Sequence, residues 1–471
     1  MANLRPPVGG INATEYISVL DIDRPEIMDE LFERKGDQWY GFFMMIMKAW
    51  GFEMPVAQTT YYHYEDDEYI RTMRVGSTVA SGQGGSQAAF TITLDANDVF
   101  TDANSGVHVF PRKGDVFMFP TFTGGVRDKE AVVTAVNAAG PTVTLKFKKA
   151  AWTTDTLAVG TNIILVSGAF AEGTGMPDSV IENIRKKSNQ TQIIKEAWSG
   201  TGTEMTNVKW IKYTSGGQDI NAYYAYGQKA MDYRMLYKLD GALMWSSDTD
   251  TSPGIEDPLG LTTRKLKTTK GLAPWIREEG QNVPYTIGNF NMSKFDVIAK
   301  IIDQNRGSDT YMWLHGFDLG TEIKNTLADW LKDSDYSYGT GENIKIKFSS
   351  YESNDVKHLF RKQGALSNTA SYGATGFEDK QSFAFIMPIG MRKMYRDENR
   401  SEYRMAPMFG YRYKSFAGIN RKMVLAKWNG ISGYQPYTQP VTQLDQNSLF
   451  SLADVGFQGM CGNQFMILQG Q

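Results

Sequence analysis

The residue types that carry most enzyme chemistry are sparse and scattered in this chain. The four histidines are His63, His108, His315 and His358, and none has a partner at the spacing of a metal site. The sequence contains no H-E-x-x-H helix, no nucleophile elbow and no glycine-rich phosphate loop with its lysine. Cys461 is the one cysteine, which excludes an intrachain disulfide and a thiolate metal cluster. We therefore predict no catalytic residue and no cofactor, and we expect the protein not to be an enzyme.

One acidic run has the composition of a cation site. Residues Glu65–Glu68 are consecutive carboxylates, and carboxylate oxygens are the ligands that calcium prefers. A run of this kind is more often a solvated turn, or a strand edge protected by its charge. We favour a solvated turn or a charge-protected strand edge over a cation site.

A second acidic motif imitates the start of a calcium loop. Asp248, Asp250 and Asp257 lie in the segment SSDTDTSPGIED. However, Leu259 occupies the position that needs a bidentate glutamate, and Gly254 comes one position late. We interpret the segment as a loop that leaves a helix, and we predict no metal ligand in it.

Two basic clusters, Lys146–Lys149 and Arg264–Lys270, are candidates for weak, salt-sensitive contact with nucleic acid. Ordinary solvated faces are the favoured alternative. The whole chain has 49 basic and 52 acidic residues and a net charge of −3, whereas a dedicated nucleic-acid binder is usually basic. The charge balance argues against tight binding of nucleic acid.

The composition is that of a globular protein. The chain has 471 residues, of which 41% are apolar and 21% charged, enough for two to four domains. The first ten residues, MANLRPPVGG, lack the apolar core of a signal peptide. The most apolar run, Trp39–Phe52, is too short to span a membrane and contains Lys48. We expect it to be a helix that is buried in the core or covered by a neighbouring molecule.

The N-terminal third combines helices with a β-rich module. We predict helices over Ile17–Phe32 and Asp37–Trp50, then an extended segment that ends in a linker at Ser81–Gln87. The segment Ala88–Phe170 holds six short β-rich runs separated by glycine, asparagine, aspartate and proline. That spacing predicts a small antiparallel β-barrel or sandwich, placed as an insertion. After it, residues 171–215 read as a long exposed loop or hairpin.

The strongest helical pattern follows. Asp219 is the expected N-cap of a helix over Ile220–Trp245, whose apolar residues recur at three- and four-residue steps. The rest of the chain is α+β. It begins with a strand-like segment, LKTTKGLAPWI, and continues with helices near Ser293–Gln304 and Thr321–Lys332 among further strands.

The order of these elements resembles the major capsid protein of tailed bacteriophages, the Hong Kong 97 fold. Four stretches carry the likeness. They are AEGTGMPDSVIENIRKKSNQTQIIKEAWSGTGTE, AYGQKAMDYRMLYKLDGALMWSSDT, TTKGLAPWIREEG and NMSKFDVIAKIIDQNRG. They resemble the segment before the spine helix, the spine helix and its exit, and the start of the axial domain. The inserted β module departs from the minimal fold and is similar to capsid proteins of crAss-like phages.

The resemblance implies an α+β fold with a fixed order of parts. These are an N-terminal arm (1–52), an extended loop (53–87 and 171–218) interrupted by a β-barrel or sandwich domain (88–170), a spine helix of the peripheral domain (219–247), an axial domain with peripheral elements (248–400) and C-terminal strands (401–471). Residues 1–50 would lie along a neighbouring subunit. The extended loop would reach across a neighbour's peripheral domain.

The function implied by the resemblance is self-assembly into hexamers and pentamers of an icosahedral head shell around double-stranded DNA. The implied partners are copies of the chain, the portal and auxiliary, decoration or scaffold proteins, with no membrane and no sequence-specific contact with DNA. The implied location is the virion, assembled in the bacterial cytoplasm. Two alternatives stay open: a tail, baseplate or decoration protein, and a carbohydrate-binding protein or glycoside hydrolase, which would require two convergent carboxylates.

Overall fold

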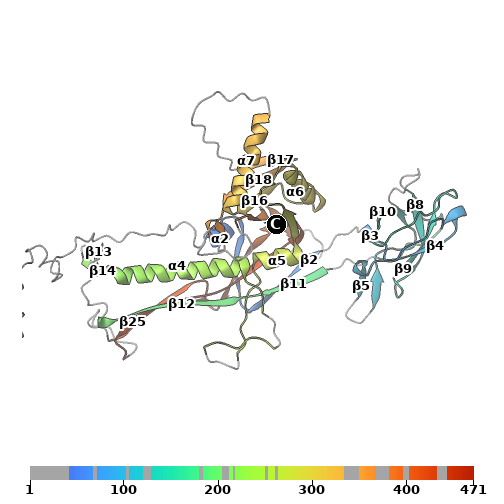
Figure 1. Ribbon diagram of the computed structural model, residues 1–471. Coiled ribbons are helices and arrows are strands. Elements are labelled where there is room, and N and C mark those ends of the chain that lie inside the picture. The colour runs from blue at the N-terminus through green and yellow to red at the C-terminus, as the bar shows by residue number, and fades with distance from the viewer. Residues whose placement is uncertain are drawn as a thin grey trace, which may run out of the picture. The chain divides into compact units, whose positions relative to one another are not determined.

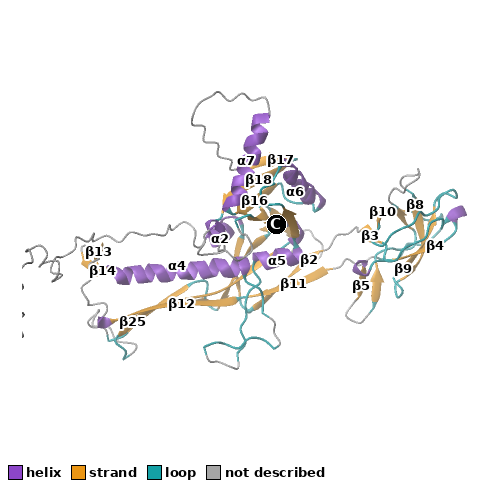
Figure 2. Cartoon of the chain, in the orientation of Figure 1, coloured by secondary structure: helices purple, strands orange, loops and turns teal. Residues whose placement is uncertain are grey.

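The computed structural model has mixed α/β architecture and two compact units (Figures 1 and 2). Unit 1 comprises 1–63 and 188–471, and unit 2 comprises 64–187. The structure describes residues 42–66, 72–101, 106–119, 129–179, 184–203, 212–215, 218–249, 253–259, 264–333, 350–367, 381–395, 403–431 and 443–471. Among these residues, no helix is long and apolar enough to cross a membrane. The predicted helix Ile17–Phe32 and the first residues of the predicted arm lie outside the described residues.

The first sheet of unit 1 is organised around one long strand, β25. β12 pairs with one edge of β25, while β24 and then β22 pair with the other. β1 runs parallel to β22 and ends that side of the sheet, and β23 pairs with β22. The bounds are β1 Phe52–Val56, β12 Gln192–Thr201, β22 Phe409–Phe416, β23 Ile419–Asn420, β24 Val424–Asn429 and β25 Gln446–Gly459.

The long helix α4, Ala222–Trp245, packs lengthwise on this sheet (Figure 1). Its buried side chains include Met231, Met235, Leu239 and Leu243, which recur every four residues as the sequence predicts. The predicted N-cap is wrong. Asp219 lies in a strand, where it pairs with Thr214, so its backbone is extended and the helix begins after it.

A short hairpin precedes α4 and connects it to the preceding chain. Its strands are β13 Lys212–Ser215 and β14 Gln218–Asn221.

The apolar helix predicted before residue 52 is α2, Phe42–Trp50. Phe43, Met44, Ile46 and Met47 are buried in the same core as α4. The backbone N–H of Met44 donates to Oδ1 of Asp240 at 3.2 Å, so a carboxylate on α4 accepts from the first turn of α2. This part of the predicted arm therefore packs in the core of its own chain.

The strand-like reading of LKTTKGLAPWI is wrong in its second half. Leu272–Glu279 forms helix α5, with Leu272, Trp275 and Ile276 buried. Pro274 lies in the first turn, where its missing N–H has no partner inside the helix to lose. Proline there is compatible with a helix start rather than a strand.

Gln192–Thr201, predicted as part of an exposed loop or hairpin, is a strand and belongs to the main sheet rather than to an exposed segment. β12 pairs with β25 in continuous antiparallel register from Gln192↔Val455 to Thr201↔Gln446. The preceding strand β11, Ile184–Gln190, pairs with β2, Thr60–Asp66. β12 contributes Ile194 to the hydrophobic core of unit 1.

The second sheet of unit 1 has the order β15-β26-β19-β16-β18-β17. Helices α6 and α7 correspond to the two helices predicted near 293–304 and 321–332, although α7 starts earlier than predicted. The bounds are β15 Gln281–Tyr285, α6 Met292–Gln304, β16 Thr310–His315, α7 Phe317–Asp333, β17 Ser350–Ser353, β18 Val356–Lys362, α8 Gly364–Ser367, β19 Phe383–Pro388 and β26 Met466–Gly470. A separate hairpin pairs β20 Met391–Tyr395 with β21 Tyr403–Pro407.

Unit 2 is a closed six-stranded barrel with the strand order β3-β10-β7-β8-β9-β4. An antiparallel bridge between Val75 and Leu94 joins the two ends of the order, and Gly76 N donates to Thr93 O at 2.8 Å. Closure leaves no free edge in the barrel. Its strands are β3 Thr72–Arg74, β4 Phe90–Thr93, β7 Asp115–Met118, β8 Glu130–Asn137, β9 Thr142–Phe147 and β10 Asn162–Gly168. The remaining predicted strand, β6 Val107–Val109, pairs with β5 Val99–Thr101 in a hairpin.

The predicted linker Ser81–Gln87 is part of the barrel unit. Gly82 N donates to Thr154 O at 2.7 Å and Gln83 N to Thr154 Oγ1 at 2.9 Å. Gly84, at φ +80°, leaves room for the ring of Phe147, which a Cβ there would meet at 2.6 Å. The glycines of this segment serve close packing rather than flexibility.

A fragment of residues 64–187 should fold alone with one cooperative thermal transition. A fragment of 88–170 should not, because it lacks β3 and the buried side chains of Met73, Val75 and Val79. Circular dichroism during heating compares the two. A cooperative transition of the shorter fragment at the same temperature would contradict the barrel closure.

His358 lies in the core of the second sheet with none of its side chain exposed. Its Nδ1 accepts from Nε1 of Trp313 at 3.1 Å, and the rings of Phe295 and Phe360 surround the pair. Burial lowers the pKa of His358 from 6.5 to about 4. The unfolded chain therefore binds a proton between these pH values that the folded chain does not, and stability falls as the pH falls through this window.

His358→Gln should reduce this acid sensitivity. The buried imidazole costs on the order of 3 kcal/mol of stability between pH 7 and pH 4, and glutamine keeps an acceptor for Trp313 without titrating. Urea unfolding of both proteins across this range should give a shallower pH slope for the variant. The exposed His108→Gln is the control for a histidine substitution outside this core, and a His358→Gln slope equal to that of the parent would refute the assignment.

Candidate functional site

The two acidic segments weighed as cation sites do not come together as ion ligands among the residues that the structure describes. Glu65 and Asp66 lie at the end of β2, and the other two acidic residues of that run lie outside the described residues. Asp248 lies 3.5 Å from Nζ of Lys270, and Oδ1 of Asp257 accepts from Leu259 N at 2.9 Å. In the described part of the chain, no three His, Cys, Asp or Glu side chains lie together as ion ligands.

The two basic clusters are partly neutralised by nearby groups. Lys148 forms an ion pair with Glu130, and Nζ of Lys149 lies 5.0 Å from the ring centre of Trp152. Lys265 lies 3.2 Å from Glu256. These contacts agree with the solvated-face interpretation.

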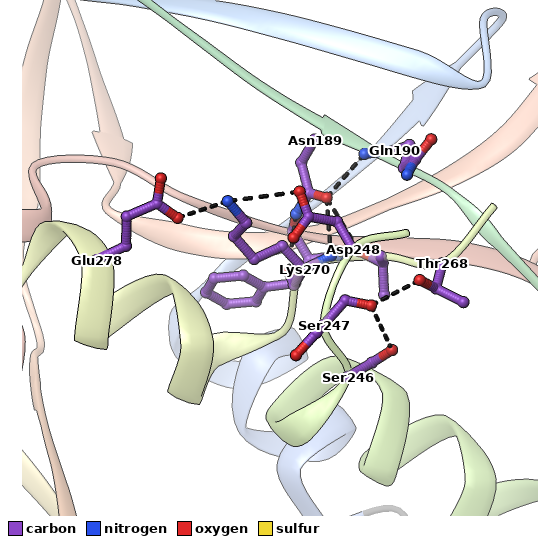
Figure 3. Close-up of polar contacts among 10 residues, drawn as sticks. Asn189, Gln190, Ser246, Ser247, Asp248, Thr268, Lys270 and Glu278 are labelled. Atoms are coloured by element: carbon purple, nitrogen blue, oxygen red, sulfur yellow. Dashed lines mark hydrogen bonds and ion pairs between the residues drawn. The ribbon is translucent and has the colours of Figure 1, made fainter. Parts of the chain in front are cut away.

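Lys270 belongs to a polar junction at the end of α4 (Figure 3). Its Nζ lies 2.5 Å from Oε2 of Glu278 on α5. Burial acts to lower the pKa of Lys270, but the carboxylates of Glu278 and Asp248 outweigh burial and raise it. On the other side, its backbone faces Asn189 from β11. The sequence had assigned these residues to separate elements, and nothing in their spacing indicated that they meet.

Ion pairs and a close side-chain contact hold the long helix α4 against β12. The Glu196 carboxylate accepts from Arg234 Nε at 3.1 Å and from Lys238 Nζ at 2.5 Å, so one strand residue bridges two successive turns of α4. Burial acts to raise the pKa of Glu196, but the two cations outweigh burial and lower it. Further along, Trp198 packs against Gly227, where any Cβ would lie 2.3 Å from the indole Nε1.

The opposite face of the same sheet carries exposed apolar side chains, which we call the open face. Because residues alternate between faces, Ile193 points away from the side on which Glu196 and Trp198 meet α4. Cross-strand pairing then places Phe450, Leu452, Val424 and Trp428 on the open face, and the rings of Trp428 and Phe450 lie 5.2 Å apart. Ile193 and Trp428 are each 52% exposed. Exposed apolar clusters of this kind mark interaction surfaces.

A shallow groove of about 510 Å³ runs between α4 and β12. It is lined by Gln192, Ile193, Ile194, Lys195, Lys238, Gly241, Ala242, Trp245 and Ser246. A glycosidase needs two carboxylates on either side of its substrate. The lining of this groove has lysines and no carboxylate, so its chemistry does not fit that alternative.

Comparison with known proteins finds similarity in backbone alone. No protein-family model and no curated protein matches the chain. A chain of Gordonia phage Cozz matches with a TM-score of 0.42 at 10% identity, covering 99% of this chain and 98% of that chain. A chain of Mycobacterium phage Adephagia matches with a TM-score of 0.40 at 8% identity, covering 98% and 99%. A chain from the capsid of an empty GTA particle matches with a TM-score of 0.40 at 6% identity, covering 96% of both.

Gly227→Ala should destabilise the protein, although glycine to alanine inside a helix normally stabilises by about 0.5–1 kcal/mol. The added methyl would overlap Trp198, and overpacking of this kind costs about 1–3 kcal/mol. Urea denaturation measures the change. Gln228→Ala, exposed on the same helix, is the matched control, and Trp198→Phe in the Gly227→Ala background should recover part of the loss. A stabilised Gly227→Ala protein would show that α4 does not pack on Trp198 in this way.

Proposed function

We propose that this protein is the major capsid protein of a tailed bacteriophage. It self-associates into hexamers and pentamers of an icosahedral shell that encloses double-stranded DNA. The observation that carries the proposal is the open face. It presents an apolar surface on a rigid sheet whose other face is already covered by α4, so its natural cover is another polypeptide.

The arrangement of elements supports the same function. A single long helix lies on a sheet built from distant parts of the chain, and an extended pair, β2 and β11, leads out of this unit and back. A second sheet with α6 and α7 forms a separate hydrophobic core. In the proposed function, α4 is the spine helix of the peripheral domain, and the second sheet is the axial domain.

The extended pair and the barrel have proposed roles at subunit contacts. β2 and β11 form the base of the extended loop that reaches a neighbour. Unit 2 is the domain inserted into that loop, as in capsid proteins of crAss-like phages.

The proposed partners and location follow from the shell. Copies of the chain are the main partners, and portal, scaffold or decoration proteins join them in the virion head after assembly in the host cytoplasm. The near-balance of 49 basic and 52 acidic residues suits a wall that encloses DNA without binding it tightly. The role is structural and not enzymatic.

Expression of the full chain, followed by negative-stain microscopy and sedimentation, tests the proposal. Shells, tubes or capsomer rings are expected, whereas a strictly monomeric protein at high concentration would refute it.

Trp428→Ser should raise the concentration needed for assembly by about tenfold or more. Burial of a large apolar side chain contributes about 1.5–3 kcal/mol, and about 1.4 kcal/mol corresponds to a factor of ten. Because Trp428 is half-exposed in the subunit, thermal stability should change little. Leu259→Ser, at a side chain that is 80% exposed in the loop between α4 and α5 and outside the strands of the open face, is the control. Unchanged assembly of the Trp428 variant would remove the open face from the interface.

A further inference from the structure

The chain crosses between the two units twice, leaving unit 1 along β2 and returning along β11. Both crossings are anchored at one atom of unit 1. The hydroxyl of Tyr61, on β2, donates to the carbonyl oxygen of Phe457 on β25. Nδ2 of Asn189, at the end of β11, donates to the same oxygen at 2.7 Å. A carbonyl oxygen has two lone pairs, so both are used here. One donor comes from the strand that leaves unit 1 and the other from the strand that returns.

The amide of Asn189 also binds the backbone of Lys270 in both directions. Nδ2 donates to Lys270 O at 2.8 Å, and Oδ1 accepts from Lys270 N at 2.9 Å (Figure 3). Oδ1 further accepts from Gln190 N at 2.8 Å. Only a side-chain amide can donate and accept in this way, because a carboxylate has no donor and a hydroxyl has too few groups.

The segment that Asn189 binds has little regular pairing of its own. Thr269 N donates to Gln192 Oε1 at 3.3 Å, and Thr268 N donates to Thr249 Oγ1 at 3.4 Å. Thr269 is fully buried, and its Oγ1 accepts from Phe457 N at 3.0 Å. Side chains from other elements therefore satisfy backbone groups that a neighbouring strand would usually satisfy.

Gly456 makes the close approach possible. A Cβ there would lie 2.6 Å from Gln190 O and 2.7 Å from the Tyr61 hydroxyl. Any side chain would push the two crossings away from β25.

We propose that Asn189, Tyr61 and the Phe457 carbonyl form a clamp that holds both crossings at their exit from unit 1. The clamp sets the starting geometry of the extended loop for contact with a second copy of the chain. Asn189 and Tyr61 are thus positioning residues for assembly, an inference that rests on the proposed shell function only for its second step.

The first test needs no assembly. In Asn189→Asp, the two donated hydrogen bonds are lost and a carboxylate faces two carbonyl oxygens. Hydrogen–deuterium exchange of the full chain should then accelerate about tenfold or more in 184–190 and 60–63. The core of the second sheet should keep its protection. Asn282→Asp, at an exposed asparagine of β15, is the isosteric control.

Tyr61→Phe keeps the ring and removes only the hydroxyl donor, so it still tests the clamp if Asn189→Asp does not fold. It should accelerate exchange in the same segments, and Tyr64→Phe, at a tyrosine that is 68% exposed, should not. The double variant of Tyr61 and Asn189 should show less than the sum of the single effects, because the two donors share one acceptor. Exchange equal to the controls would overturn the clamp.

The second test adds assembly of the same variants. At a temperature where each variant is folded, particle yield should fall severalfold in Asn189→Asp and Tyr61→Phe relative to their controls. Faster local exchange with parent-level particle yield would keep the clamp and overturn its role in assembly. If the parent protein forms no particles, the proposed function fails, and the exchange result for the clamp stands by itself.

Discussion

Strand β25 must have its backbone groups satisfied on both edges, and most of unit 1 follows from how that is done. β12 covers one edge, while β24 and then β22 cover the other. The N-terminal strand β1 enters the sheet only through β22. Because these partners come from distant parts of the chain, the sheet forms only when the whole unit folds.

The alternation of side chains along β25 then separates its two functions. Ala453, Val455 and Phe457 face the core that α2, α4 and α5 share. Phe450 and Leu452 point to the open face, beside Trp428 and Ile193. One strand therefore stabilises the subunit with one side and presents an apolar surface with the other.

The same strand controls the chain crossings. The Phe457 ring is buried in the core while its carbonyl accepts from both Tyr61 and Asn189. The core thus reaches the base of the extended pair through hydrogen bonds from two side chains to one backbone carbonyl. This links the stability of unit 1 to the geometry of its most extended part.

The sequence by itself determined the elements whose pattern is local. The four-residue repeat of Met231, Met235 and Leu239 specified α4, and alternating apolar runs separated by turn residues specified the barrel strands. The absence of catalytic motifs was also visible in the sequence.

Only the tertiary structure decided features that depend on distant partners. β12 belongs to the main sheet because β25 pairs with it, the segment 81–87 packs in the barrel unit because Thr154 accepts its backbone bonds, and Asp219 is extended because Thr214 pairs with it. The open face and the Phe457 clamp belong to this class too. A hydrogen bond between residues far apart in sequence leaves no periodic signal in either segment, so only the folded chain reveals it.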